Sequence, residues 1–215
     1  MTRETQQRAR ARASSKGAKN GIRIVARAKL PTRFGPFDIL GIEGKNKKES
    51  AVALVHGRIR GQTPLVRVHS QCLTGDVLSS ERCDCRAQLE LSLRRIAAAP
   101  SGILLYLPQE GRGIGLMNKL RAYELQDRGM DTVEANEELG FAADSRDYGF
   151  SAAALLLLGV RRVRLLSNNP DKVQQLESAG IRVAERVPCR PRTSRTSRAY
   201  METKRTKLGH LLDRL

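Results

Sequence analysis

The chain has 215 residues, of which 40% are hydrophobic and 28% charged, so it is long and apolar enough to bury a core of its own. Its longest apolar run, residues 152–158, is far shorter than the ~20 residues of a membrane-spanning helix, and no apolar segment follows the basic N-terminus as in a secretory signal. We therefore expect no membrane span and no secretion, and the free cysteines predict the reducing environment of the cytoplasm.

The formal net charge of +17 is concentrated at the two ends of the sequence. Residues 1–20 and 182–215 carry net charges of +5 and +7, which leaves +5 for the 161 residues between them. Residues 1–21, rich in Arg, Ala, Ser and Gln without apolar periodicity, predict a disordered basic extension, and residues 22–215 a single domain. Such tails suit non-specific contact with nucleic acid, although a solvated tail without function explains them equally well.

The first half of the sequence predicts strands and one helix. Short alternating or β-branched segments, separated by Gly, Pro, Asn and Lys, are typical of strands. They are residues 22–26, 37–40, 51–56, 65–69 and 102–107. Before the last of them, Leu89, Leu93 and Ile96 recur at helical spacing and Pro100 follows, which predicts a helix.

The second half predicts three more helices and two more strands. The helices are expected from the glycine-rich turn 109–116 to about residue 126, over residues 147–158 and over residues 170–179, and the strands over residues 161–167 and 181–187. Asn169 is expected to cap the last helix, with Pro170 in its first turn. The pattern predicts an α/β fold with mixed β-sheets in the N-terminal half, and helices and a parallel βαβ unit in the C-terminal half.

Three of the four cysteines, Cys72, Cys83 and Cys85, lie within one short stretch. Thiolates are soft anionic ligands, and three of them can bind one zinc ion at about 2.3 Å. Their spacing is not that of a zinc finger. Three protein ligands leave a fourth position open, as in catalytic zinc sites, where a bound water ionises near neutral pH. We therefore predict a catalytic zinc site.

Three other interpretations of the cysteines stay open at this point. The thiols can cluster in a core without a metal, because free cysteines often serve as small hydrophobic residues. A disulfide fits less well, because Cys83 and Cys85 are too close in sequence to pair comfortably. A structural zinc site closed by His69 or Cys189 would leave no open position.

Two turns suit phosphate groups. The glycine-rich turn at residues 111–115 opens a helix and carries Arg112, and residues 167–172 combine a strand end, a hydroxyl, a helix start and Lys172. Helix N-termini and cations bind anions, although neither turn has the spacing of a P-loop or a dinucleotide fingerprint. Each turn alone is equally well explained as an ordinary connection. Two of them beside a metal indicate a polyphosphate substrate.

Several motifs, in order, resemble those of the GTP cyclohydrolase II family over residues 28–215. They are RVHSQCLTGD (67–76), RCDC (82–85), QEGRGIG (109–115), KLRAY (119–123), DTVEAN (131–136), LGFAAD (139–144) and SNNP (167–170). The resemblance implies a homodimeric enzyme of the first step of riboflavin biosynthesis. It would hydrolyse GTP to formate, pyrophosphate and 2,5-diamino-6-(ribosylamino)pyrimidin-4-one 5'-phosphate with one Zn²⁺ per chain.

The resemblance also implies roles for single residues. The three cysteines fall on the family's zinc ligands, whose activated water would attack C8 of guanine, and Tyr123 on a tyrosine that orients the release of formate. Asp144 and Arg146 fall on the proton acceptor and on the nucleophile proposed for the α-phosphorus. Because a guanidinium stays charged, a transition-state clamp by Arg146 is the alternative. A Mg²⁺ ion is expected with the triphosphate.

A longer set of positions falls on the family's GTP-binding residues. The set is Arg67, Val68, His69, Ser70, Gln71, Gln88, Glu110, Gly111, Arg112, Thr132, Ser167 and Lys172. Chemically, Glu110 can accept hydrogen bonds from guanine N1–H and the 2-amino group, or else hold an arginine. Arg112 and Lys172 suit phosphate oxygens.

Two other functions remain open from the sequence. One is a variant enzyme that opens the ring and stops at the formamide, and the other is a non-catalytic, zinc-stabilised, basic RNA-binding module. The low aromatic content of 4% argues against the second. Gln71, Arg86 and Ser167 replace the glutamate, glycine and threonine that are common in the family, which bears on substrate affinity more than on reaction type.

Overall fold

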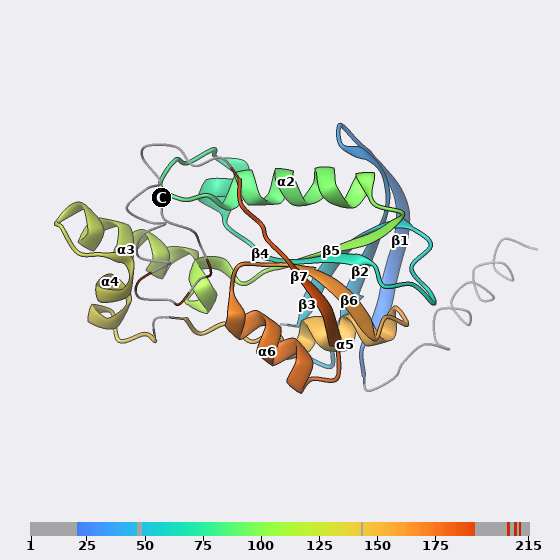
Figure 1. Ribbon diagram of the computed structural model, residues 1–215. Helices are drawn as coiled ribbons and strands as arrows, with labels where there is room; N and C mark the ends of the chain where they lie inside the picture. Colours follow the sequence, from blue (N-terminus) through green and yellow to red (C-terminus); the bar gives the residue numbers. More distant parts are fainter. Residues whose placement is uncertain are drawn as a thin grey trace, which may run out of the picture.

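The structure is a computed structural model that describes residues 21–46, 49–142 and 144–191, together with residues 206, 209 and 211. Within these ranges seven strands form one sheet (Figure 1). In spatial order they are β1 (Arg23–Thr32), β2 (Gly35–Glu43), β3 (Ser50–Gly57), β5 (Ser101–Leu107), β4 (Leu65–Ser70), β6 (Arg162–Leu166) and β7 (Arg182–Val187). The predicted extension, up to residue 20, lies outside the described residues, as do residues 192–198 of an arginine-rich segment.

The sheet is mixed, with an antiparallel and a parallel part. Strands β1, β2, β3 and β5 pair antiparallel, whereas β5, β4, β6 and β7 pair parallel. The strands of the N-terminal half and those of the C-terminal half therefore belong to one sheet. Strand β6, helix α6 (Pro170–Ser178) and strand β7 form the predicted parallel βαβ unit. The α/β fold class is confirmed.

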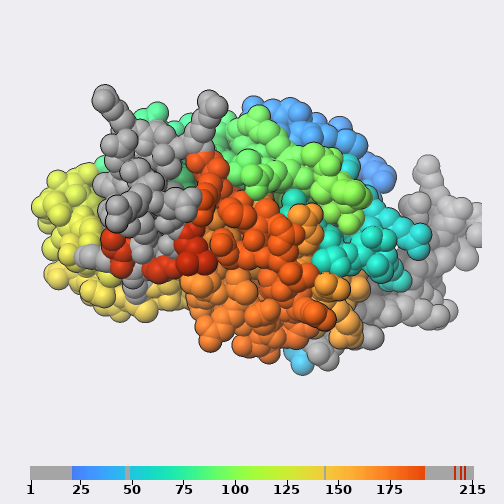
Figure 2. Space-filling model, in the orientation of Figure 1, coloured from blue at the N-terminus to red at the C-terminus, as the bar shows by residue number. Residues whose placement is uncertain are grey.

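Helices cover both faces of the sheet (Figure 1). Helix α2 (Cys85–Ala98) lies on one face, and α5 (Gly149–Leu157) and α6 lie on the other. Helices α3 (Leu116–Asp127) and α4 (Thr132–Glu138) contact each other at the end of the molecule away from the β1–β2 hairpin (Figure 1). In Figure 2, the yellow residues lie at this end and the blue residues of the N-terminal strands lie away from it. No helix in the described part of the chain combines the length and the apolar character needed to span a membrane.

Strand β4 alternates between the two cores, and this alternation positions the site. Val66 and Val68 belong to the core on the α5 and α6 side, whereas Leu65 packs in the core with α2. Successive strand residues point to opposite faces. Arg67 and His69 therefore point to the α2 side, where both are buried although they are polar.

Capping explains two helix starts, one predicted and one missed. Asn169 caps α6 as predicted, because its Oδ1 accepts a hydrogen bond from Asp171 N at 3.0 Å. Helix α4 is absent from the prediction, since its seven residues show little apolar periodicity. Asp131 and Glu134 form a capping box at its start, a spacing that is visible in the sequence.

Candidate active site and metal centre

A pocket opens at the carboxyl ends of the three adjacent strands β5, β4 and β6. Ligands in open α/β sheets bind at this edge, because the loops after parallel strands meet there. Its walls come from the segments that follow these strands and from α3 and α4. The predicted residues that line it are Arg67, His69, Ser70, Gln71, Cys72, Cys83, Cys85, Gln88, Glu110, Gly111, Arg112, Tyr123, Thr132, Arg146, Ser167 and Lys172.

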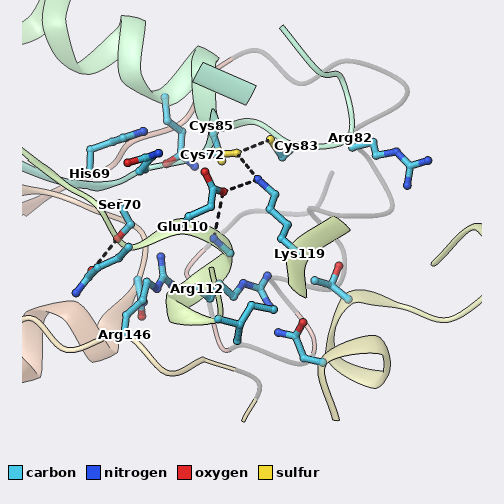
Figure 3. Close-up of a pocket in the computed structure, with 18 of the residues that line it drawn as sticks. His69, Ser70, Cys72, Arg82, Cys83, Cys85, Glu110, Arg112, Lys119 and Arg146 are labelled. Carbon is cyan, nitrogen blue, oxygen red and sulfur yellow. Dashed lines mark hydrogen bonds and ion pairs between the residues drawn. The ribbon is translucent and has the colours of Figure 1, made fainter. Parts of the chain in front are cut away.

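The three clustered cysteines converge on one point of the pocket wall (Figure 3). Cys72 lies just before a short π-helix, Leu73–Val77, and Cys85 is the first residue of α2. The three Sγ atoms lie within 4.8 Å of one another, and those of Cys72 and Cys83 are 3.7 Å apart. Two sulfurs that each lie ~2.3 Å from a tetrahedral zinc ion would be about 3.8 Å apart. The spacing of the thiols therefore fits zinc.

Gly75 leaves the room that this cluster needs. A Cβ atom at this position would lie 2.8 Å from Cys83 Sγ and 3.1 Å from Cys72 Sγ. Gly75 is itself buried in the π-helix that follows Cys72. The two sulfurs would have to move apart to admit a side chain there.

We expect Gly75→Ala to weaken zinc binding about 10- to 100-fold, the range for changes that disturb the groups around a metal site. Competition with a chromophoric chelator measures the dissociation constant. Val77→Ala changes a residue of the same π-helix that is 63% exposed, so it is the matched control and should bind zinc as the wild type does. Wild-type affinity in Gly75→Ala would show that the sulfurs do not need this space.

The structure separates the two candidate fourth ligands of a closed site from the cysteine cluster. His69 Nε2 lies 3.1 Å from both carboxylate oxygens of Asp76, and His69 is outside the group of converging ligand atoms. Cys189 is buried in the core on the α2 side, with its Sγ 3.8 Å from Ser92 Oγ. Among the described residues, the cluster thus consists of three thiols beside an open pocket.

The pKa values of the three clustered thiols are shifted in different directions. The pKa of the Cys72 thiol is lowered because Cys83 and Cys85 donate hydrogen bonds to it and because Lys119 adds positive charge. Donation to Cys72 raises the pKa of Cys83 to about 11, and it also raises that of the buried Cys85. Of the three thiols, Cys72 is therefore the one whose anionic form these contacts favour.

Asp76 anchors the start of the cysteine loop. Its Oδ2 accepts hydrogen bonds from Tyr106 OH at 2.9 Å and from Cys72 N at 3.0 Å, beside the contact with His69. Burial lowers the pKa of His69, against the raising effect of Asp76. The ring is therefore neutral at pH 7, with its proton on the nitrogen that faces Asp76. The sequence motif contained Asp76, but its role depends on contacts that residue spacing does not reveal.

The pocket also has a basic region, which includes Arg67 and Lys172. Arg67 donates to Leu166 O at 3.0 Å and to Gln88 Oε1 at 2.5 Å, and Lys172 Nζ donates to Val68 O at 2.9 Å. Burial, together with the charge of Arg67, lowers the pKa of Lys172 well below its usual range. A phosphate bound here would offset the mutual repulsion of these cations.

Arg146 and Asp144 form an ion pair at the same end of the pocket. Arg146 Nε donates to Asp144 Oδ1 at 2.8 Å, and a second contact joins Nη2 to Oδ2. Burial alone would raise the pKa of Asp144, but the hydrogen bonds and charge of Arg146 outweigh it and lower the pKa. Arg146 lines the pocket, whereas Asp144 contacts it through Arg146.

Tyr123 lies close to the cysteines. Its hydroxyl is 3.0 Å from Thr74 Oγ1, which lies 3.7 Å from Cys72 Sγ. The guanidinium of Arg82 stacks over the tyrosine ring at 4.8 Å from its centre. The predicted tyrosine is thus beside the predicted metal ligands, on α3.

Two predicted GTP-binding residues have other contacts in the structure. The side chain of Val68 is fully buried in the core, and only its carbonyl group reaches toward the site, through Lys172. The carboxylate of Glu110 accepts hydrogen bonds from Lys119 Nζ at 2.7 Å and from Leu73 N at 2.7 Å. Glu110 therefore holds a lysine, where the sequence suggested guanine or an arginine.

Comparison with known proteins agrees with the motifs. The family model for GTP cyclohydrolase II matches residues 23–188. GTP cyclohydrolase-2 of Citrobacter koseri (strain ATCC BAA-895) is 56% identical over 192 residues, 89% of this chain and 98% of that protein. GTP cyclohydrolase-2 of Escherichia coli O9:H4 (strain HS) is 55% identical over 194 residues, 90% of this chain and 99% of that protein.

A longer relative matches as well. A riboflavin biosynthesis protein of Vibrio vulnificus (strain YJ016) is 53% identical over 196 residues, which are 91% of this chain but 53% of that protein. The chain therefore spans about half the length of this relative. Given a family model that matches most of the sequence, and curated relatives above 50% identity, the chain belongs to the GTP cyclohydrolase II family of hydrolases.

Proposed function

We propose that the protein catalyses the zinc-dependent hydrolysis of GTP in the first step of riboflavin biosynthesis. The products are formate, pyrophosphate and 2,5-diamino-6-(ribosylamino)pyrimidin-4-one 5'-phosphate. One observation carries the proposal: three converging thiols and a set of buried cations face the same pocket. A purine can lie at the sulfur end while its phosphates reach the basic end.

The three cysteines would hold the zinc ion. Zinc with an open coordination position supplies a water of lowered pKa and polarises a bound carbonyl group. The positions of the three cysteines determine from which side a zinc-bound water would reach the guanine ring. Cys72, Cys83 and Cys85 all line one wall, so guanine C8 must face that wall for both of its C–N bonds to be cleaved.

The side chain of Tyr123 supports the release of formate. Its hydroxyl shares a hydrogen bond with Thr74 and lies on the cysteine side of the pocket. Burial raises the pKa of Tyr123, so the hydroxyl keeps its proton at neutral pH. A protonated phenol can donate to the formamide oxygen or to the departing nitrogen.

The basic end of the pocket supports the release of pyrophosphate. Arg146 is oriented by Asp144, and the buried residues Lys172 and Arg67 line the same pocket. Positive charge fixed in advance stabilises the charge that develops on transferring phosphoryl oxygens. A Mg²⁺ ion held by the triphosphate itself would share this task. Each of the three cleavages, two at C8 and one at the α-phosphorus, consumes one water molecule.

Analysis of the products tests the proposal. The zinc-loaded protein, incubated with GTP and Mg²⁺, should release formate and pyrophosphate in equal amounts, and ATP should give neither. Pyrophosphate without formate would establish the variant that stops at the formamide. No turnover, with RNA retained at low salt and lost steeply as salt rises, would establish the RNA-binding module in place of the enzyme.

Assembly and location complete the proposal. All four cysteines are free thiols, which fits a reducing compartment, and we place the protein in the cytoplasm. We expect a homodimer, and light scattering that gives the mass of one chain, 23.8 kDa, would contradict this.

A further inference from the structure

Lys119 is a partly buried lysine beside the cysteine cluster that the proposed reaction steps do not use. It projects from α3 toward the pocket wall, and its side chain is only 12% exposed. Its Nζ lies 3.1 Å from Cys72 Sγ and 2.7 Å from Glu110 Oε1, so that the ammonium stands between the sulfur and the carboxylate (Figure 3). This ammonium contacts one of the three thiols directly, so its positive charge offsets part of the negative charge that the three sulfurs carry when they bind a metal.

Glu110 fixes the position of this ammonium group. The glutamate follows β5 and is 8% exposed, and its second oxygen accepts a hydrogen bond from Leu73 N, next to Cys72. The carboxylate thus links the glycine-rich turn, α3 and the cysteine loop. Because Glu110 is held at both oxygens, Lys119 has little freedom to leave the sulfur for solvent.

The geometry of α3 places Lys119 and Tyr123 on the same side of the site. They are four residues apart, which puts both side chains on one face of the helix. Lys119 Nζ lies 5.7 Å from the centre of the Tyr123 ring, and both side chains reach Cys72, directly or through Thr74. One helix therefore supplies two groups to the surroundings of the same sulfur.

The ammonium group of Lys119 can reduce the electron donation from the three sulfurs to a bound metal ion. Three thiolates on a divalent cation have a net charge of −1, and strong electron donation by sulfur reduces the ability of the cation to acidify water or polarise a carbonyl group. A charge-assisted hydrogen bond to one sulfur withdraws part of that electron density. Partners of metal ligands commonly tune a site in this way.

We propose that Lys119 is a positioning residue for the metal centre: held by Glu110, it donates an N–H···S hydrogen bond to Cys72 and moderates the electron donation of the three-thiolate set. The inference rests on the proposed zinc site. It assigns a function to a residue of the KLRAY motif, and it gives Glu110 a task other than binding the guanine base.

Cobalt(II) in place of zinc tests the proposal directly, because thiolate-to-cobalt charge-transfer absorption reports the electron density on sulfur. In metal-free Lys119→Met protein loaded with cobalt chloride, we expect this band at longer wavelength than in the wild type. Lys119→Arg keeps a charged donor and should restore the band. Arg121→Met, an exposed position on the same helix, is the control and should match the wild type.

Kinetics of the zinc-loaded variants complete the test. We expect Lys119→Met to retain zinc and to lose 10- to 100-fold in kcat, as for other partners of metal ligands, with an unchanged KM for GTP. Lys119→Arg should recover much of the rate. A charge-transfer band at the wild-type wavelength in Lys119→Met overturns the proposal, even if kcat falls, because Lys119 would then act on the substrate or on folding. The spectra require no turnover, so inactivity of the wild type toward GTP would refute the proposed function while leaving the cobalt result to decide the role of Lys119.

Discussion

Cys83→Ser is expected to remove zinc from the protein and to reduce formate release by more than the 10- to 100-fold that follows changes in the partners of metal ligands. Serine keeps the size of the side chain, but its hydroxyl is a far weaker zinc ligand than a thiolate. With Cys83 gone, two thiols remain, fewer than the three of a stable catalytic site. Zinc per chain, by atomic absorption, and formate, by an enzyme-coupled assay, are measured on the same preparation.

Cys189→Ser is the matched control for this experiment. Cys189 is fully buried but lies in the core beside Ser92, away from the cluster. This variant should keep one zinc ion per chain and its formate release, although a hydroxyl in the core will lower its stability. Full zinc content and wild-type turnover in Cys83→Ser would rule out the three-cysteine centre as the site of hydrolysis.

Arg146→Ala is expected to lower the rate of pyrophosphate release by about 10³- to 10⁵-fold, the effect of removing an arginine that stabilises phosphoryl transfer. The guanidinium is held by Asp144 and lines the basic end of the pocket, so the substitution removes an oriented charge. It also removes the charge that keeps the pKa of Asp144 low. Pyrophosphate is followed by a coupled phosphate assay after pyrophosphatase treatment.

Two further measurements sharpen this prediction. Asp144→Asn keeps Arg146 but loses the ionic contact that orients it, and we expect a smaller loss than in Arg146→Ala. A denaturing quench at alkaline pH with α-³²P-labelled GTP distinguishes a clamp from a nucleophile. An electrostatic clamp leaves the denatured wild-type protein without label, whereas a covalent guanylyl group on Arg146 leaves it labelled. Wild-type pyrophosphate release in Arg146→Ala would contradict both roles.

Local patterns in the sequence predicted most of the regular structure. Alternation along β4 predicted a strand, and the sequence 168–170 predicted the start of α6 because capping depends on neighbouring residues. Helix α4 was missed because one short helix has too few apolar positions for periodicity to show. The sequence also left open that all strands share one sheet, because strand order depends on pairing between distant segments.

The site was predictable where residue type alone determines the chemistry. Three cysteines in one short stretch indicated a metal, and the structure brings their sulfurs together. Asp76 and Lys119 were missed because Asp76 contacts Tyr106, 30 positions away, and Lys119 contacts Cys72, 47 positions away. In a sequence, Lys119 looks like any surface lysine, and only the fold shows that a carboxylate and a sulfur hold it.

Titration of zinc into chelator-treated protein tests the central claim most directly. Formate release from GTP, in the presence of Mg²⁺, should rise in proportion to added zinc and become constant at one zinc ion per chain. Formate release at the full rate from protein that contains no zinc, or no formate at any zinc content, would contradict a three-cysteine zinc centre that opens the guanine ring.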